Sequence, residues 1–114
     1  MNTRIEYMYR DAANYKQNGH WIITGPATEE QVERLRTGCL NDGDGAFFVP
    51  DLVGIPPLQG DWDEEIDHTY HTLDDILPTD EDADDTRTIE ELINEFEERD
   101  WEEEADDIAV QKAA

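Results

Sequence analysis

The fold of this chain depends on one stretch in its acidic half, Thr88-Ile89-Glu90-Glu91-Leu92-Ile93-Asn94-Glu95-Phe96. Thr88 and Glu91 have the spacing of a capping box, in which each side chain accepts a hydrogen bond from the other residue's backbone N–H. The apolar residues recur at i, i+3, i+4 and i+7, which places them on one stripe of a helix. They are Ile89, Leu92, Ile93 and Phe96. The pattern predicts an amphipathic helix that packs this stripe on a core.

The other side of this helix is rich in carboxylates. A single helix over residues 88–104 would span about 25 Å at ~1.5 Å per residue, and it would carry nine carboxylates and one arginine. That is one net negative charge every ~3 Å, close to the ~3.4 Å phosphate spacing of one DNA strand. A row opposite the apolar stripe consists of Glu91, Glu95, Glu98 and Glu102, and it is flanked by Glu90 and Glu97. These six residues form the predicted partner-binding surface.

The negative charge is concentrated in the second half of the chain. The 114 residues carry a formal net charge of −23. Residues 1–60 hold eight acidic and five basic residues, a net of −3, whereas residues 61–114 hold 23 acidic and three basic residues, a net of −20. Such charge repels nucleic acid and anionic membranes, so neither is expected as a direct partner. It favours a basic protein as the partner, including a nucleic-acid-binding protein.

The remaining composition favours a small cytoplasmic protein. The length fits one domain. The single cysteine, Cys39, excludes an intrachain disulfide and indicates a compartment that is not oxidising. The N-terminus lacks the apolar segment of a secretory signal, and no apolar run is long enough to span a bilayer. Nothing in the sequence specifies an oligomeric state.

The rest of the pattern predicts an α+β fold. Short β-rich runs alternate with turn residues, and a capping box of Thr28 with Gln31 predicts a helix between them. Asn18-Gly19 is a turn signal between the first two strands. Strands are expected around residues 5–9, 21–23, 46–49 and 66–73. We therefore expect a small antiparallel sheet of about four strands with two helices, the second being the acidic C-terminal helix with its tail.

These elements are expected to form one domain with three parts. Residues 1–77 make the α+β core, residues 78–87 an acidic linker, and residues 88–114 an acidic amphipathic helix and tail packed on the core. The linker interpretation rests on a run of Asp, Glu, Thr and Pro without apolar periodicity. The apolar stripe is the surface by which the third part would attach to the first.

Four segments resemble a family that has no known function. They are Tyr9-Arg10-Asp11-Ala12-Ala13-Asn14-Tyr15-Lys16, Phe47-Phe48-Val49-Pro50, Gly54-Ile55-Pro56 and Asp67-His68-Thr69-Tyr70-His71. They are similar to small uncharacterised prokaryotic proteins that open with Tyr-Arg-Asp-Ala-x-Asn-Tyr-Lys and carry a later Asp-His-x-x-His. The resemblance extends to about residue 73. It implies a shared α+β core and no activity.

Two groups of side chains contain atoms that can bind metal ions. In the first, Asp67, His68 and His71, the two histidines would point to opposite faces of the predicted strand and would not share an ion. Their alternative role is pairing with nearby carboxylates, which would raise the pKa of each histidine.

The second group has part of the spacing of a calcium-binding EF-hand loop. The matching residues are Asp80, Asp82, Asp84 and Glu91. The sixth position of such a loop requires glycine for a sharp turn, but this chain has Asp85 there. Pro78 also interrupts an incoming helix. We therefore expect no metal site and no cofactor.

No arrangement of residues predicts catalysis, so the chain is expected not to be an enzyme. It lacks a Ser/His/Asp arrangement at a nucleophile elbow, a phosphate-binding glycine loop and a CxxC pair. The leading hypothesis is a non-catalytic binding protein whose carboxylate row meets a basic protein, in its sharpest form a DNA-mimic inhibitor of the anti-CRISPR or anti-restriction type. One alternative is a small halophile protein whose acidity is adaptation to salt. Another alternative is a metal-binding protein.

Overall fold

The protein is built on one antiparallel sheet. The computed structural model describes residues 1–43, 45–63 and 65–113, so Ala114, the last residue of the predicted tail, lies outside the described residues. The strands are β1 (Asn2–Arg10), β2 (Lys16–Ile23), β3 (Leu40–Asp42), β4 (Gly45–Phe48) and β5 (His71–Thr79). Their order is β2-β1-β5-β4-β3, and every neighbouring pair is antiparallel.

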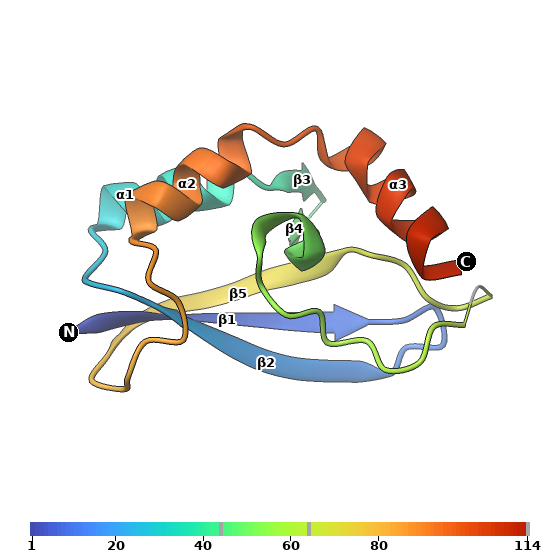
Figure 1. Cartoon of the computed structure of the whole chain (residues 1–114), viewed down its shortest axis with the longest axis horizontal. Coiled ribbons are helices and arrows are strands. Elements are labelled where there is room, and N and C mark those ends of the chain that lie inside the picture. Colours follow the sequence, from blue (N-terminus) through green and yellow to red (C-terminus); the bar gives the residue numbers. More distant parts are fainter. Residues whose placement is uncertain (44, 64, 114) are drawn as a thin grey trace.

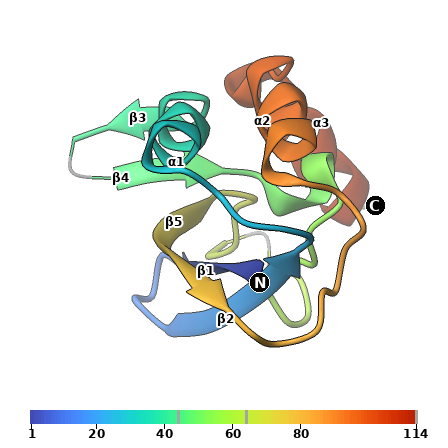
Figure 2. The ribbon, with the colours of Figure 1, turned by 90° about the vertical axis from the view of Figure 1, so that its left-hand side faces the viewer.

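Helices form a layer over one face of this sheet (Figures 1 and 2). They are α1 (Glu29–Thr37), the 3₁₀ helix η1 (Pro50–Val53), α2 (Ile89–Glu97) and α3 (Trp101–Ala113). The α+β prediction is confirmed, with five described strands in place of about four and three described α-helices in place of two. Both predicted capping boxes are present, one before α1 and one before α2.

The β1–β2 hairpin forms the floor of the core. Every second residue of β1 is buried, which brings Ile5 and Tyr7 into the cluster beneath the helices. The turn expected at Asn18-Gly19 is wrong, because both residues lie inside β2 and pair with β1. Glycine at position 19 has a different role. A Cβ atom there would lie 2.6 Å from the Cδ2 atom of Leu58, so Leu58 packs directly on the strand backbone.

The fifth strand lies later in the chain than its pattern indicates. The strand predicted over residues 66–73 is wrong, because β5 begins at His71 and continues to Thr79. A β-bulge shifts its register, since Ile5 pairs with Ile76 but Tyr7 pairs with Leu73. The bulge breaks the alternation of buried and exposed residues, which is the signal that a sequence pattern relies on.

Arg36 of α1 stabilises this bulge. A bulge leaves backbone groups outside the ladder of hydrogen bonds, and the Arg36 Nη2 atom donates to the Asp74 carbonyl oxygen at 2.5 Å. Burial, together with the nearby carboxylates of Asp75 and Glu6, raises the pKa of the Asp74 carboxyl group. The first helix thus holds the irregular part of β5 beneath it.

The acidic C-terminal segment forms two helices, so the prediction of one helix over residues 88–104 is wrong. The reason is the position of Trp101. At ~100° per residue, a continuous helix would turn Trp101 about 140° away from Phe96 and off the buried stripe. The break lets the Trp101 ring pack edge-on against Phe96 with centroids 5.3 Å apart, and its Nε1 atom donates to the Gly38 carbonyl oxygen at 2.7 Å.

The segment 78–87, interpreted from the sequence as a linker, begins inside β5, which ends at Thr79. Its remaining residues, 80–87, run along the outer edge of β2. The Asp84 N–H donates to the Ile22 carbonyl oxygen at 2.8 Å, and the Thr24 N–H donates to the Arg87 carbonyl oxygen at 2.9 Å. The two segments also form an isolated parallel bridge. The acidic segment therefore has fixed backbone partners between β5 and α2, and we call residues 80–87 the strap.

Phe96 joins the sheet to both C-terminal helices, which makes it a test of the core. It is 1% exposed and stacks on Phe48 with ring centroids 5.5 Å apart. Replacing Phe96 by alanine is expected to lower the free energy of unfolding by about 3–5 kcal/mol, because a buried aromatic ring leaves a cavity when removed. Equilibrium unfolding in urea measures this loss.

The matched control is Asn94→Ala on the exposed side of the same helix. The Asn94 side chain makes no hydrogen bond to any described residue, so the free energy of unfolding should change by less than about 0.5 kcal/mol. Similar losses in the two variants would contradict the packing role of Phe96.

Candidate functional site

The predicted partner-binding carboxylates on α2 lie close to arginines from other elements. The Arg34 Nη1 atom is 2.6 Å from Glu90, and its Nη2 atom is 3.5 Å from Glu97. Glu95 forms an ion pair with Arg87. Four of the six predicted residues, counting the loose pair of Glu98 with Arg99, therefore already have a positive partner within the chain.

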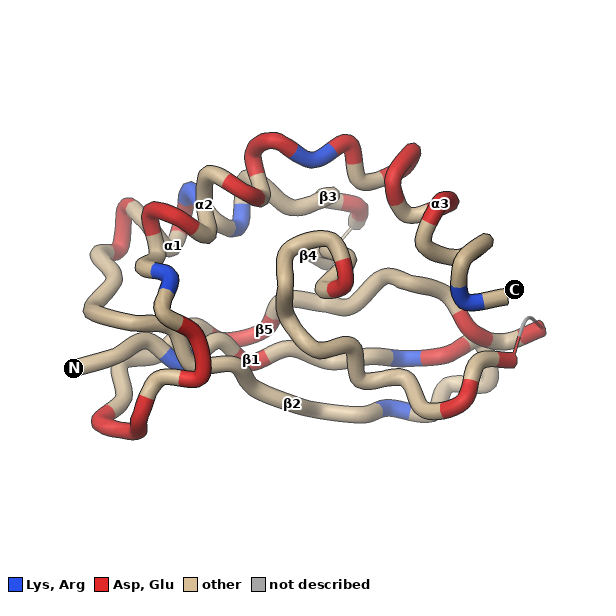
Figure 3. The backbone as a smooth tube through the Cα atoms, in the orientation of Figure 1, with Lys and Arg blue, Asp and Glu red and all other residues tan. Residues whose placement is uncertain are grey.

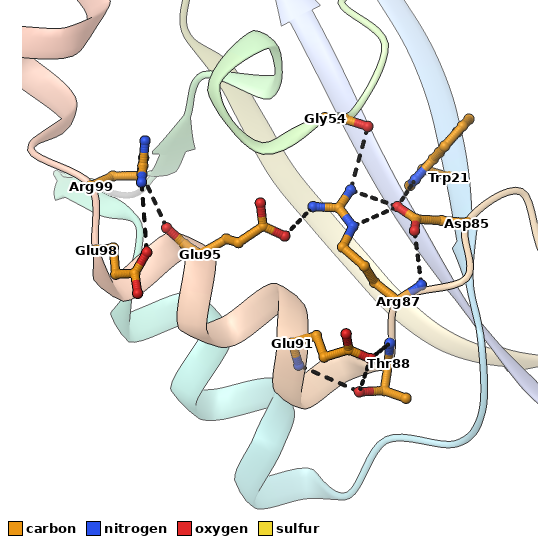
Figure 4. Close-up of polar contacts among 9 residues, drawn as sticks. All are labelled: Trp21, Gly54, Asp85, Arg87, Thr88, Glu91, Glu95, Glu98 and Arg99. Atoms are coloured by element: carbon orange, nitrogen blue, oxygen red, sulfur yellow. Dashed lines mark hydrogen bonds and ion pairs between the residues drawn. The ribbon is translucent and has the colours of Figure 1, made fainter.

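Glu91 and Glu98 complete the set near α2 (Figure 4). Glu91 closes the capping box by accepting the Thr88 N–H at 3.2 Å. Glu98 lies 3.8 Å from the Arg99 Nη2 atom, but its side chain is 71% exposed and such pairs contribute little. The sixth residue, Glu102, lies on α3. The continuous row predicted on a single helix does not exist.

Arg87 is the centre of the polar contacts beside α2 (Figure 4). Its Nε and Nη2 atoms lie 2.9 and 2.5 Å from the Asp85 Oδ2 atom, and Nη2 donates to the Gly54 carbonyl oxygen at 3.4 Å. The Trp21 Nε1 atom also donates to Asp85 at 2.9 Å. Burial raises the pKa of Asp85, but the hydrogen bonds from Arg87 and Trp21 outweigh burial and lower the pKa to about 2. Glu95 is thus one partner in a structural network.

The outward face of α3 carries four exposed carboxylates, which sequence reasoning identified only in part. They are Glu102, Glu103, Asp106 and Asp107. Their spacing of i, i+1, i+4 and i+5 places them on one face of a helix. No ion pair joins any of them to another residue in the described ranges. The neighbouring Glu104 differs, because it pairs with Arg99 at 2.9 Å. We call the four carboxylates the α3 acidic face.

The opposite side and both ends of α3 are attached to the core. Trp101 and Ala105 are buried, and Ile108 packs against the core cluster. Near the end of the helix, the Lys112 Nζ atom lies 3.0 Å from the Asp51 Oδ2 atom. The helical i, i+4 and i+7 spacing of Trp101, Ala105 and Ile108 is the sequence signal that would have identified this helix.

The charges of the α3 acidic face have opposing effects on the helix itself. Carboxylates in the first turn are stabilised by the positive end of the helix dipole, and Glu102 and Glu103 lie in that turn. Like charges four residues apart repel each other, and both Glu102–Asp106 and Glu103–Asp107 have this spacing. A positively charged surface placed against this face would relieve the repulsion.

Asp67 and His68, the first metal candidates, form a polar cluster with Tyr9. The Tyr9 hydroxyl donates to the Asp67 Oδ1 atom at 2.6 Å and accepts the His68 N–H at 3.2 Å. Both ring nitrogens of His68 are occupied. Its Nε2 atom donates to the Arg10 carbonyl oxygen at 2.7 Å, and its Nδ1 atom accepts the Tyr70 N–H at 3.1 Å. The cluster fastens the loop before β5 to the end of β1.

His71 is buried as a neutral ring. It is 1% exposed, its Nε2 atom accepts the Leu58 N–H at 2.9 Å, and its Nδ1 atom donates to the Thr69 carbonyl oxygen at 3.1 Å. Burial lowers the pKa of His71 to about 4. The expectation that a carboxylate partner raises its pKa is therefore wrong.

The residues with EF-hand spacing are also separated by their contacts. The Asp84 carboxylate accepts the Ile22 N–H at 3.0 Å, and Glu91 caps α2. Asp80 and Asp82 are exposed in the strap. Within the part of the chain that the structure describes, no group of three or more His, Cys, Asp or Glu side chains is placed to hold a metal ion.

No known protein family, curated protein or solved structure matches this chain. Among the described helices, none combines the length and the apolar character needed to cross a membrane. The function must therefore be inferred from the contacts and charges of the chain itself.

The buried neutral ring of His71 predicts a loss of stability on acidification. Unfolded histidine titrates near pH 6.5, whereas the pKa of the folded ring is about 4. Between these values the unfolded chain binds one more proton than the folded chain, so the contribution of His71 is full above about pH 6.5 and falls as the pH decreases. At about pH 5 the loss is about 2 kcal/mol.

The variant His71→Gln keeps a donor and an acceptor but does not titrate. Carboxylate protonation affects the wild type and the variant alike, so it cancels when their unfolding free energies are subtracted. This difference, wild type minus variant, should be smaller at about pH 5 than at about pH 7.5. Urea unfolding measures it. A difference that does not vary with pH would contradict the buried neutral ring.

Proposed function

We propose that this protein is a non-catalytic binding protein whose α3 acidic face meets a basic surface of another protein. The observation that carries the proposal is the set of four exposed carboxylates on α3 without a cationic partner among the described residues. They occupy about 7.5 Å of helix axis, or one charge per ~2 Å. Duplex DNA has one charge per ~1.7 Å. Over this short length the two charge densities are similar.

The α3 acidic face is a better binding surface than the carboxylates of α2. A partner that contacted Glu90 or Glu95 would have to compete with Arg34 or Arg87. The α3 carboxylates need no such exchange, and a basic partner would relieve their mutual repulsion. The net charge of −23 would also steer a basic protein toward this molecule and raise the association rate.

The sharpest form of this proposal is a DNA-mimic inhibitor of the anti-restriction or anti-CRISPR type. A groove that binds DNA presents Arg and Lys side chains arranged for phosphate oxygens. Helix α3, with 13 residues, is about 20 Å long, so its carboxylates can enter such a groove while Trp101 and Ala105 stay on the core.

The test is competition with DNA for a type I restriction enzyme and for a Cas9-type nuclease. Fluorescence anisotropy of a labelled cognate duplex measures displacement by the protein. In the α3 variant, Glu102→Gln, Glu103→Gln, Asp106→Asn and Asp107→Asn are combined. Its inhibition should weaken at least about tenfold, equivalent to 1.4 kcal/mol. Raising the salt concentration should weaken inhibition by the wild type, because exposed charges are screened.

A control variant removes the same charge elsewhere. It combines Asp42→Asn, Asp75→Asn, Asp80→Asn and Asp82→Asn, at exposed residues without an ion pair in the described structure. This variant should inhibit as the wild type does. Inhibition that survives in the α3 variant, or that falls equally in the two variants, would contradict a role specific to α3.

Adaptation to salt is the second candidate explanation of the acidity, and one observation favours it. Acidic residues also lie outside α3, in the loops at both ends of the sheet (Figure 3). If solvent adaptation is the main role, the free energy of unfolding should rise steeply up to molar potassium chloride. The α3 variant and the control variant should then respond alike. Full stability in dilute buffer would count against this explanation.

A further inference from the structure

β2 lies at one edge of the sheet, and β1 is its only neighbouring strand in the sheet of the described residues (Figure 1). In an antiparallel strand, the backbone groups of alternate residues point to opposite sides. Ile22 belongs to the outward set, because its N–H and its carbonyl oxygen both bind Asp84 of the strap. The β1–β2 register continues without a shift along the whole strand. The other residues of the outward set are therefore Lys16, Asn18 and His20.

These three residues leave a free edge. All three are exposed, and no hydrogen bond from another described segment reaches their backbone N–H or carbonyl groups. The strap shows that this edge accepts a neighbouring segment, since it already pairs with β2 at Ile22 and Thr24. Unpaired backbone groups along an exposed strand are a template for an added strand.

On the face of the sheet that the helices cover, the surroundings of this free edge are acidic. Beside Gln17 lies an open hollow, which is lined by residues 60–63 and 65–67 and by the end of β1. Its carboxylates are Asp11, Asp61, Asp63, Glu65 and Asp67. A strand added to β2 would direct every second side chain to this side. Basic side chains at those positions would lie close to the carboxylates.

The opposite side of the edge has a different charge. Lys16, Asn18 and His20 place their side chains there, because alternate residues of a strand point to opposite faces. Arg10 pairs directly with Lys16 across the β1–β2 ladder, so its side chain lies on the same face. Glu6 pairs with His20 on this face, but it also forms an ion pair with Arg4. The charge on this face is therefore mixed, and basic side chains of an added strand are favoured on the face beneath the helices instead.

We propose that the free edge of β2 binds an extended segment of a partner protein that has basic residues at every second position. The backbone of this segment pairs with Lys16, Asn18 and His20, and its basic side chains face the acidic hollow. Binding by strand addition takes affinity from backbone hydrogen bonds and specificity from alternate side chains. This surface is separate from the α3 acidic face and goes beyond the proposed function.

A second copy of the chain is a poorer occupant of this edge. Two β2 strands side by side would bring Lys16 and His20 of one copy close to those of the other. Each chain also has a net charge of −23, which opposes self-association. The charge pattern therefore favours a basic segment of a different protein.

The probe is the end-blocked peptide Lys-Thr-Lys-Val-Lys-Thr-Lys, which has lysine on one face of a strand. Nitrogen-15 NMR spectra of the full chain are recorded during its titration. The amide signals of Lys16, Asn18 and His20 should shift, and their hydrogen exchange should slow. The scrambled peptide Lys-Lys-Thr-Val-Thr-Lys-Lys, with the same charge, should bind at least about tenfold more weakly.

Methylated peptides separate strand pairing from simple charge attraction. Two versions of the probe carry N-methyl groups on one or the other set of alternate backbone amides. One version should lose at least about tenfold in affinity, because its hydrogen-bond donors toward β2 are removed. The proposal is overturned if all peptides bind alike, if no shift occurs at the three amides, or if these signals broaden with protein concentration in the absence of peptide.

Two protein variants complete the test. Asn18→Pro removes one outward N–H, and proline is tolerated on an edge strand where that N–H faces away from the sheet. The combination of Asp61→Asn, Asp63→Asn and Glu65→Gln leaves the strand unchanged and removes charge from the hollow. Both should weaken peptide binding, whereas the α3 variant should bind the peptide nearly as well as the wild type. The two proposals, for the α3 acidic face and for the free edge of β2, can therefore be contradicted independently.

Discussion

The contacts of Arg87 hold together parts of the chain that their own charge would separate. Arg87 is the last residue of the strap. Its guanidinium group binds Asp85 within the strap, Gly54 at the end of η1 and Glu95 of helix α2. Arginine suits this position because its planar fork of N–H groups can reach several acceptors at once, whereas lysine is a point charge. With 31 acidic and eight basic residues, self-repulsion opposes every compact arrangement of this chain. Arg34 acts in the same way between α1 and α2.

Patterns confined to one element predicted the fold well, whereas features that need two elements were missed. Each capping box lies within one helix and its N-cap, and the apolar stripe lies within α2, so the spacing of residues in the sequence reveals them. The bulge in β5 depends on its pairing with β1 and on Arg36 of α1. The break between α2 and α3 depends on Trp101, whose hydrogen-bond partner Gly38 is 63 residues away. The spacing of residues along the chain does not indicate contacts between distant segments.

The candidate site shows the same division. The concentration of charge in the C-terminal region is evident from a count of residues, but the carboxylates that remain free depend on arginines elsewhere. Arg34 forms ion pairs with Glu90 and Glu97, and only Glu102 of the predicted set belongs to the α3 acidic face. The histidine cluster is similar, since the neutral state of His71 depends on its burial and on the Leu58 N–H. Tertiary contacts, rather than residue type, decide which polar groups are available.

Helix α3 is the least embedded of the C-terminal helices. Two of its 13 residues are buried, compared with four of the nine in α2. Elements with few buried residues detach from the core at a low free-energy cost. If only molecules with α3 docked can bind, the apparent affinity equals the intrinsic affinity multiplied by the docked fraction. Changes at Trp101 or Lys112, which never touch the partner, can therefore tune the strength of binding and leave the contact surface unaltered.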